Sequence, residues 1–151
     1  MSDTSDLIKL YSARILELAA DIPHTDRLDH PDASSKRRSP LCGSTVTVDI
    51  TLKDGKIDEF GQDVKACALG QAAASVVGAH VQGCSREQIE RARDELKEML
   101  KSDGPTPSAP FDGLEVLRPA REYKNRHASI MLVLEATLEA FDHALDASSC
   151  A

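Results

Sequence analysis

The chain has 151 residues, of which 41% are hydrophobic and 28% charged, an ordinary balance for one globular domain with a real core. Its net charge of −7, 3% aromatic content and lack of Trp argue against a general nucleic-acid binder, which needs a basic surface or aromatic stacking platforms. No apolar run is long enough for a membrane span, and the N-terminus lacks the basic region of a signal peptide. We therefore expect a cytoplasmic protein without membrane or nucleic-acid partners, whose four cysteines are reduced ligands, reactive groups or core fillers.

The chain opens with a predicted helix over residues 6–20, followed by a predicted loop over residues 24–40. The helix is expected to bury one apolar face at helical spacing, made of Leu7, Tyr11, Ile15 and Leu18. Within the loop, the basic triplet at residues 36–38 is interpreted as solvated charge, with docking of an acidic partner as the minority alternative. A third strand could come from the segment before Cys42, although its composition does not indicate one.

Residues 45–52 alternate strictly between aliphatic residues and Thr or Asp, which predicts a strand with one buried face. Asp54-Gly55 then predicts a tight turn, because both turn residues need positive φ, and the chain returns as the second strand of a hairpin. In the register that a two-residue turn sets, Cys42 and Cys67 lie opposite each other at the open end of the hairpin. Directly opposed Cβ atoms are roughly 4.5–5.5 Å apart, within reach of one metal ion or small cluster.

The return strand contains a break in phase, since Ile57 does not alternate with Phe60 and Val64. Such a break predicts a β-bulge near Asp58 and Glu59, which slips the pairing by one residue. Even then, the two cysteines remain diagonal neighbours.

Four helical segments are predicted after the hairpin, over residues 68–81, 86–101, 111–117 and 125–144. The first is rich in small side chains, which allow close packing on a sheet. Ser85 and Gln88 form a capping box for the second. Arg118-Pro119 is expected to end the third helix, and Asn125 to cap the fourth.

Together these elements predict one domain over residues 1–145 and a flexible tail over residues 146–151. Cys84 precedes the second of the four helices and is interpreted as structural or incidental. Cys150 falls in the predicted tail, where it is weak evidence for any function.

Cys67 and His127 each fall at the start of a predicted helix. The unpaired N–H groups and the positive dipole end there favour the thiolate of Cys67, the form that binds metal. A cysteine in this place without Cys42 opposite would be interpreted as a small buried residue instead. The same dipole disfavours a charged imidazole, which leaves His127 able to bind metal, although spacing alone does not bring it to the hairpin.

Four motifs resemble the NifU/IscU-type iron–sulfur cluster assembly scaffolds: Pro-Leu-Cys-Gly (40–43), Gly-Lys-Ile (55–57), Lys-Ala-Cys-Ala (65–68) and His-Ala-Ser-Ile-Met-Leu (127–132). The resemblance runs from about Tyr11 to Phe141. It implies an α+β fold, with a small antiparallel sheet built on the hairpin and packed by about four to five helices. It also implies a transient [2Fe–2S] cluster, iron or a zinc ion, sulfur supplied by a cysteine desulfurase, and transfer of the cluster to acceptor apoproteins.

By this resemblance, Cys42 matches the first ligand cysteine of the family and Cys67 the second. Ser44 stands where the family usually has an aspartate ligand, and His127 matches a histidine found before the third cysteine in part of the family. Ala128 occupies the place of that third cysteine.

A second departure lies at residues 117–121, where Leu-Arg-Pro-Ala-Arg replaces the Leu-Pro-Pro-Val-Lys segment that chaperones recognise in one branch.

Three functional hypotheses follow. The first is a non-enzymatic scaffold or carrier that binds iron or a [2Fe–2S] cluster through Cys42 and Cys67, with His127 assisting and Ser44 as a weaker ligand. The second is a zinc-binding accessory of sulfur transfer, since two thiolates and an imidazole are good zinc ligands. The third is an interaction module that has lost its metal chemistry. A homodimer is a further expectation.

Overall fold

The computed structural model describes residues 11–40 and 43–150, apart from the side chains of residues 147–150. A three-stranded antiparallel sheet has the strand order β1 (Ala33–Arg38), β2 (Thr45–Lys53), β3 (Lys56–Lys65). The helices are α2 (Ala13–Ala20), α3 (Ala68–His80), α4 (Arg86–Ser102), the 3-10 helix η1 (Asp112–Glu122) and α5 (Lys124–Cys150). The predicted α+β fold, with a small sheet packed by helices, is confirmed.

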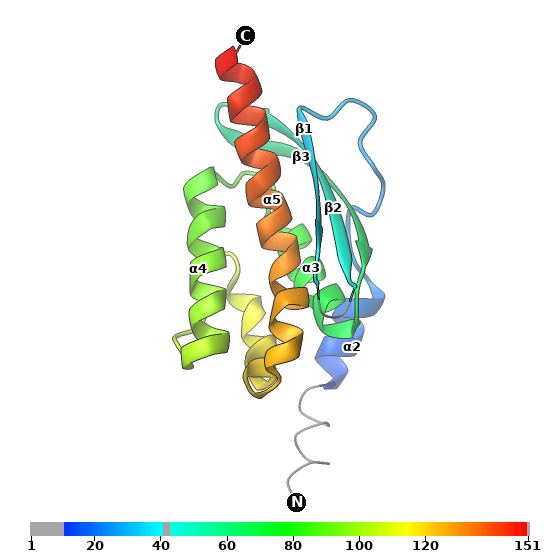
Figure 1. The fold of residues 1–151 in the computed structure, drawn as a ribbon, viewed down its shortest axis with the longest axis vertical. Helices are drawn as coiled ribbons and strands as arrows, with labels where there is room; N and C mark the ends of the chain where they lie inside the picture. The colour runs from blue at the N-terminus through cyan, green and yellow to red at the C-terminus, as the bar shows by residue number, and fades with distance from the viewer. Residues whose placement is uncertain (1–10, 41–42, 151) are drawn as a thin grey trace, which may run out of the picture.

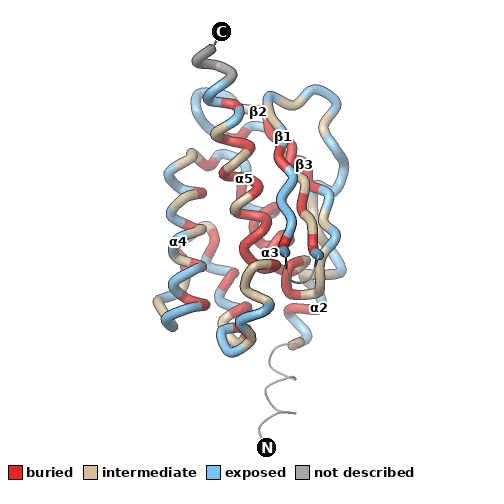
Figure 2. The backbone as a smooth tube through the Cα atoms, in the orientation of Figure 1, coloured by how far each residue is buried: buried red, intermediate tan, exposed pale blue. Residues whose placement is uncertain are grey.

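The helices form layers on one side of the sheet (Figure 1). Helix α5 runs along β1 and β2, α3 packs against both α5 and β3, and α4 lies on the side of α5 away from the sheet. The buried residues concentrate where these layers meet (Figure 2), and they include Val46, Val48, Ile50, Leu69, Leu134 and Phe141. No helix in the described part of the chain is long and apolar enough to cross a membrane.

The predicted bulge in the hairpin is confirmed. Next to the turn, Leu52 pairs with Ile57, but one residue further on Thr51 pairs with Glu59. Asp58 is therefore the extra residue, and every pair beyond it is slipped by one position. The slip keeps Ile57 and Phe60 both buried, which the uninterrupted register would not allow.

The segment before Cys42 does provide the third strand, so the predicted loop over residues 24–40 is wrong for residues 33–38. Strand β1 pairs with β2 along its whole length, from Ala33 opposite Ile50 to Arg38 opposite Thr45. Ladder hydrogen bonds to a neighbouring strand outweigh the weak strand preference of Ser, Lys and Arg. The charged side chains suit an edge strand, because they oppose pairing with another chain.

Two helix boundaries also differ from the prediction. Helix α2 begins at Ala13 because the Ser12 side chain accepts a hydrogen bond from the Ile15 N–H at 3.3 Å and caps it; Leu7 lies outside the described residues. Helix α5 begins at Lys124, so Asn125 lies in its first turn rather than at the cap, and it continues past the predicted end to Cys150. The capping box of Ser85 and Gln88 on α4 is confirmed.

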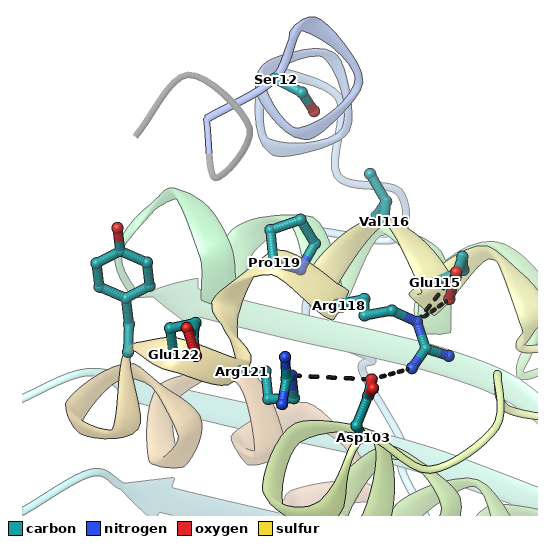
Figure 3. Close-up of a pocket in the computed structure, with 9 residues that line it drawn as sticks. Ser12, Asp103, Glu115, Val116, Arg118, Pro119, Arg121 and Glu122 are labelled. Atoms are coloured by element: carbon teal, nitrogen blue, oxygen red, sulfur yellow. Dashed lines mark hydrogen bonds and ion pairs between the residues drawn. The ribbon is translucent and has the colours of Figure 1, made fainter. Parts of the chain in front are cut away.

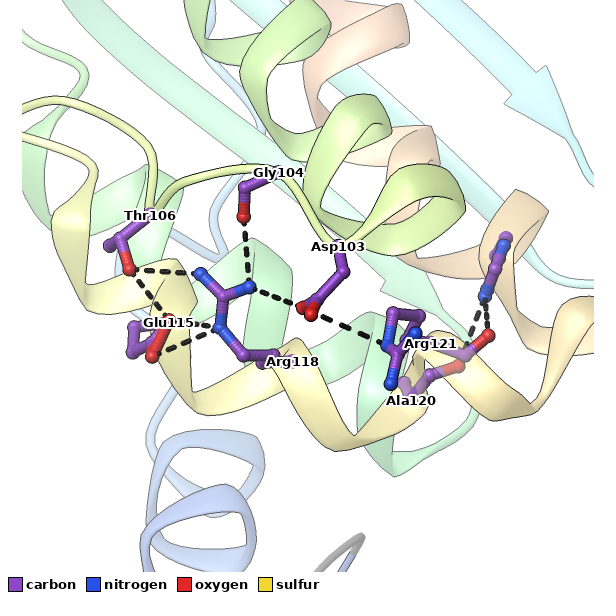
Figure 4. Close-up of polar contacts among 8 residues, drawn as sticks. Asp103, Gly104, Thr106, Glu115, Arg118, Ala120 and Arg121 are labelled. Atoms are coloured by element: carbon purple, nitrogen blue, oxygen red, sulfur yellow. Dashed lines mark hydrogen bonds and ion pairs between the residues drawn. The ribbon is translucent and has the colours of Figure 1, made fainter.

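The predicted end of a helix at Arg118-Pro119 is wrong, since η1 continues to Glu122. Arg118 stabilises this region: its guanidinium donates hydrogen bonds to Glu115, Asp103 and Thr106 and to the Gly104 carbonyl, at 2.8–3.1 Å. Figure 3 shows Arg118 turned toward Glu115 and Asp103 beside a cavity of about 650 Å³, and Figure 4 adds the contacts to Gly104 and Thr106. These bonds tie η1 to the chain that follows α4.

An ion pair between a buried carboxylate and an exposed guanidinium fixes the loop over the outer face of the sheet. Asp49 is fully buried although it lies on the face opposite Val48 and Ile50. Arg27 donates to both of its carboxylate oxygens, at 2.6 and 3.0 Å, and the Leu28 N–H donates at 3.1 Å. Burial raises the pKa of Asp49, but these hydrogen bonds outweigh it and the pKa lies below its usual value.

We expect Asp49→Asn to lower the free energy of unfolding by about 2 kcal/mol at pH 7, because charged hydrogen bonds to a buried group are lost. Since the folded-state pKa of Asp49 is depressed, its contribution is complete above the unfolded value of about 4 and is lost as the pH falls below it. The difference between variant and wild type should therefore shrink under acid conditions. Urea unfolding at several pH values measures this, with the exposed Asp58→Asn as control. A difference that stays constant down to the lowest pH would contradict the account.

Candidate metal centre

Cys67 lies at the N-cap of α3, as the sequence predicts. Strand β3 ends at Lys65 and α3 begins at Ala68, so the residue stands at the turn from sheet to helix. Its backbone carbonyl accepts the first helical hydrogen bond, from the Gln71 N–H at 2.9 Å, while its side chain makes no capping bond. Cys67 is half-buried, and its position places a possible metal ligand at the positive end of the helix dipole.

Three elements meet at this thiol. The Ser129 hydroxyl on α5 lies 3.6 Å from the Cys67 sulfur, and it donates a hydrogen bond to the Ser44 hydroxyl at 3.1 Å. Both serines are buried. Either the Cys67 thiol or the Ser129 hydroxyl can donate in this contact, because both groups carry one rotatable proton. If the thiol loses its proton to a metal, rotation of the Ser129 O–H can supply a hydrogen bond to the sulfur. We call the site of Cys67, Ser129 and Ser44 the thiol corner.

Sequence reasoning assigned no role to Ser129. A usable signal was present, because Ser129 is a polar residue at the start of the apolar run Ile-Met-Leu-Val-Leu over residues 130–134. A polar side chain on the apolar face of a helix is buried, and a buried hydroxyl needs a partner. That partner lies far away in the sequence, and only the fold identifies it.

Gly70 allows α3 and α5 to approach each other closely at the thiol corner. A Cβ atom at this position would lie 2.7 Å from the Ser129 Oγ and 3.1 Å from its carbonyl oxygen. Any larger residue must therefore push α3 away from α5, and with it Cys67.

We expect Gly70→Ala to lower the free energy of unfolding by about 1 kcal/mol, because overpacking outweighs the better helix propensity of Ala. Adding Ser129→Ala removes the nearest clashing atom, so the double variant should lose less stability than the two single losses combined. Denaturant unfolding of the four proteins measures this coupling. Strictly additive losses would contradict the close approach.

His127 lies in the first turns of α5, and its imidazole is directed at the end of η1. Its Nε2 is 3.0 Å from the Ala120 carbonyl oxygen and 3.1 Å from that of Arg121. Carbonyl oxygens accept only, so Nε2 carries the proton and Nδ1 is the nitrogen available to a metal. Ser129 follows two residues later, roughly 200° around the helix, which places His127 and the thiol corner on different sides of α5.

Cys42 lies outside the described residues. Described residues on either side of it are joined by a hydrogen bond, in which the Ser39 N–H donates to the Ser44 carbonyl at 2.8 Å. Gly43 has a positive φ of 70°. Within residues 11–40 and 43–146, no three side chains of His, Cys, Asp or Glu are close enough to share a metal ion. The described part of the site is thus one thiol supported by two hydroxyls.

Cys84 has a different environment from Cys67. It is buried, and its thiol donates to the His80 carbonyl at 3.4 Å. Burial raises the pKa of Cys84, which makes the thiolate harder to form. Its interpretation as a structural residue agrees with this placement.

The fold and the thiol corner define a small α+β protein that presents a cysteine at a helix N-terminus beside the sheet. The N-terminal domain of a nitrogen-fixing NifU-like protein from Brucella abortus has a similar structure, with a TM-score of 0.91 and 39% sequence identity. The match covers 93% of this chain and 98% of that one. The chain therefore belongs to the NifU-like family.

A more distant similarity supports the fold alone. A protein described as a candidate iron–sulfur cluster assembly scaffold for the SUF system of Fervidobacterium islandicum AW-1 matches with a TM-score of 0.77 and 15% identity, over 89% of this chain and 98% of that one. No protein-family model matches the chain. No curated protein matches it either.

Proposed function

We propose that this protein is an iron–sulfur cluster assembly scaffold or carrier, and not an enzyme. Iron or a [2Fe–2S] cluster is its cargo, held transiently by Cys42 and Cys67. The observation that carries the proposal is the placement of Cys67 at the N-cap of α3 in a chain of the NifU-like family. Thiolates are the usual protein ligands of such clusters.

The rest of the thiol corner supports this role. The Ser129 hydroxyl is within 3.6 Å of the Cys67 sulfur, and hydrogen bonds to cluster sulfur ligands adjust the stability and redox potential of the cargo. Cys42 is separated from Ser44 by one residue, so the covalent chain ties it to the same corner. Ser44 is the weaker candidate ligand, because binding a metal would disturb its bond from Ser129.

His127 is the proposed assisting ligand. Because His127 lies on a different side of α5 from the thiol corner, it joins a metal there only by giving up its bonds to the Ala120 and Arg121 carbonyls, at a cost of about 1 kcal/mol each. Ala128 supplies no third thiolate, so the protein offers fewer sulfur ligands than a [2Fe–2S] cluster uses. A labile cluster, completed by a small thiol or a second copy in a homodimer, suits a carrier that must release its cargo.

The partners that fit this function are a cysteine desulfurase, which delivers sulfur, and apoproteins that accept the finished cluster. Both must reach a half-buried thiol at the open end of the hairpin. The proposed location is the cytoplasm, where the thiols stay reduced.

Anaerobic reconstitution with ferrous iron and sulfide tests the proposal through visible absorption. The wild type should develop a cluster chromophore, and Cys42→Ser or Cys67→Ser should lose most of it, because serine is a poor ligand for iron in such clusters. Cys150→Ser is the matched control and should keep it. His127→Ala should shorten the lifetime of the chromophore severalfold without preventing its formation.

A chromophore that survives in both Cys42→Ser and Cys67→Ser, or none in the wild type, would contradict the cluster proposal. Thermal unfolding of each variant distinguishes a lost ligand from a misfolded protein.

Ala128 favours zinc binding in a sulfur-transfer accessory as the second candidate. Two thiolates and one imidazole leave one open position on a tetrahedral zinc ion. Elemental analysis of protein purified without added iron distinguishes the zinc-binding accessory from the iron–sulfur carrier. One equivalent of zinc that resists exchange, and is lost in Cys67→Ser, would favour the accessory; metal-free or iron-containing protein favours the carrier.

A further inference from the structure

A groove of about 860 Å³ lies between α4 and the start of α5, apart from the thiol corner. Arg93, Lys97 and Lys101 line it from α4, and Arg121 and Lys124 line it from the end of η1 and the start of α5. The three on α4 are spaced four residues apart, so they form a stripe about 12 Å long on one face of the helix. We call this feature the basic groove.

The basic groove stands out because the protein is acidic. Five Lys or Arg line it against two carboxylates, Asp94 and Glu135, a local charge of +3 in a chain of net charge −7. The rest of the surface is correspondingly more negative, which repels an extended polyanion such as RNA. A short acidic ligand would meet only the positive region.

Three of these cations make no ion pair among the described residues. Arg93 pairs with Asp94 at 2.9 Å, and Arg121 approaches Asp103 at 3.8 Å. In the described part of the chain, Lys97, Lys101 and Lys124 make no ion pair within 4.0 Å, and all three are exposed. Their charge is available to an external ligand.

The cations of the basic groove carry most of what an external ligand can contact. Leu100 and Met131 also line the groove, but they are only 1% and 7% exposed. A peptide with several carboxylates can meet cations spread along the stripe, which a single inorganic anion cannot do. About four extended residues span a stripe of 12 Å.

We propose that the basic groove binds a short acidic segment of a partner protein, with the carboxylates of that segment at Lys97, Lys101 and Lys124. The inference does not depend on metal binding at the thiol corner. The groove borders His127 and Ala128, so a docked partner would lie across α5 from Cys67.

Glu135 tests whether the groove attracts its ligand through positive charge, because it is a negative residue among the cations. It is half-buried in the groove and faces Arg93 and Lys97 on α4 and Arg37 on β1. Removing its charge should strengthen binding of an acidic ligand, whereas removing lysines should weaken it.

The test measures binding of the 151-residue protein to a capped, fluorescein-labelled peptide of sequence Glu-Asp-Leu-Glu-Asp-Leu. Fluorescence anisotropy reports the affinity for this peptide. The wild type should bind it and not the matching Gln-Asn-Leu-Gln-Asn-Leu peptide. Lys97→Glu with Lys101→Glu should weaken binding about tenfold, and Glu135→Gln should tighten it about threefold. Lys53→Glu with Lys56→Glu, an equal charge change at the exposed hairpin turn, is the control and should change it little.

Amide chemical-shift mapping of the wild type should place the peptide on residues 93–101 and 121–131. Equal weakening by the control pair, shifts confined to other surfaces, or full displacement by millimolar inorganic phosphate would overturn the proposal. So would a single-stranded RNA oligonucleotide that binds the groove more tightly than the peptide.

Discussion

The close packing of α3 against α5 is the constraint on which the rest of the site depends. Gly70 leaves no room for a side chain against Ser129, so the start of α3 can lie close beside α5. That contact brings the Cys67 sulfur to Ser129, and Ser129 to Ser44. One glycine therefore determines where the thiol lies and which hydroxyls surround it.

The outer face of the sheet is held by a different kind of interaction. Asp49 and Arg27 bury a charge beneath a loop, and Gly61 lets that loop approach, since a Cβ there would lie 2.5 Å from the Asp26 carbonyl oxygen. The sheet is thus covered on both faces, by helices on one and by this loop on the other. The hairpin that leads into Cys67 is therefore held on both faces, which keeps the position of the thiol well defined.

Local signals in the sequence predicted the parts of the fold that local physics decides. The alternation of aliphatic and polar residues together with Asp54-Gly55 predicted the hairpin, and the break in that alternation at Ile57 predicted the bulge. Ser85 with Gln88 predicted the start of α4. Strand β1 could only be raised as an option before Cys42, because its pairing with β2, rather than its composition, makes it a strand. The contacts of Ser129 and the direction of His127 depend on how α5 is rotated in the fold, which spacing along the chain does not determine.

Charge in the sequence was informative only where it is contiguous. The triplet at residues 36–38 is exposed, as the solvated-charge interpretation predicts, and Arg37 also pairs with Glu139 on α5 at 3.1 Å. The basic groove combines residues from three separate elements, and no run of sequence displays it. Helix α5 contributes residues both to the thiol corner and to the basic groove.

An iron anomalous-scattering map of crystals grown from anaerobically loaded protein tests the central claim most directly. The account predicts an iron peak at the thiol corner, bonded to the sulfur atoms of both Cys42 and Cys67 at roughly 2.3 Å, the usual length of a metal–thiolate bond. Iron bound away from Cys67, or the two sulfur atoms facing apart with no peak between them, would contradict it.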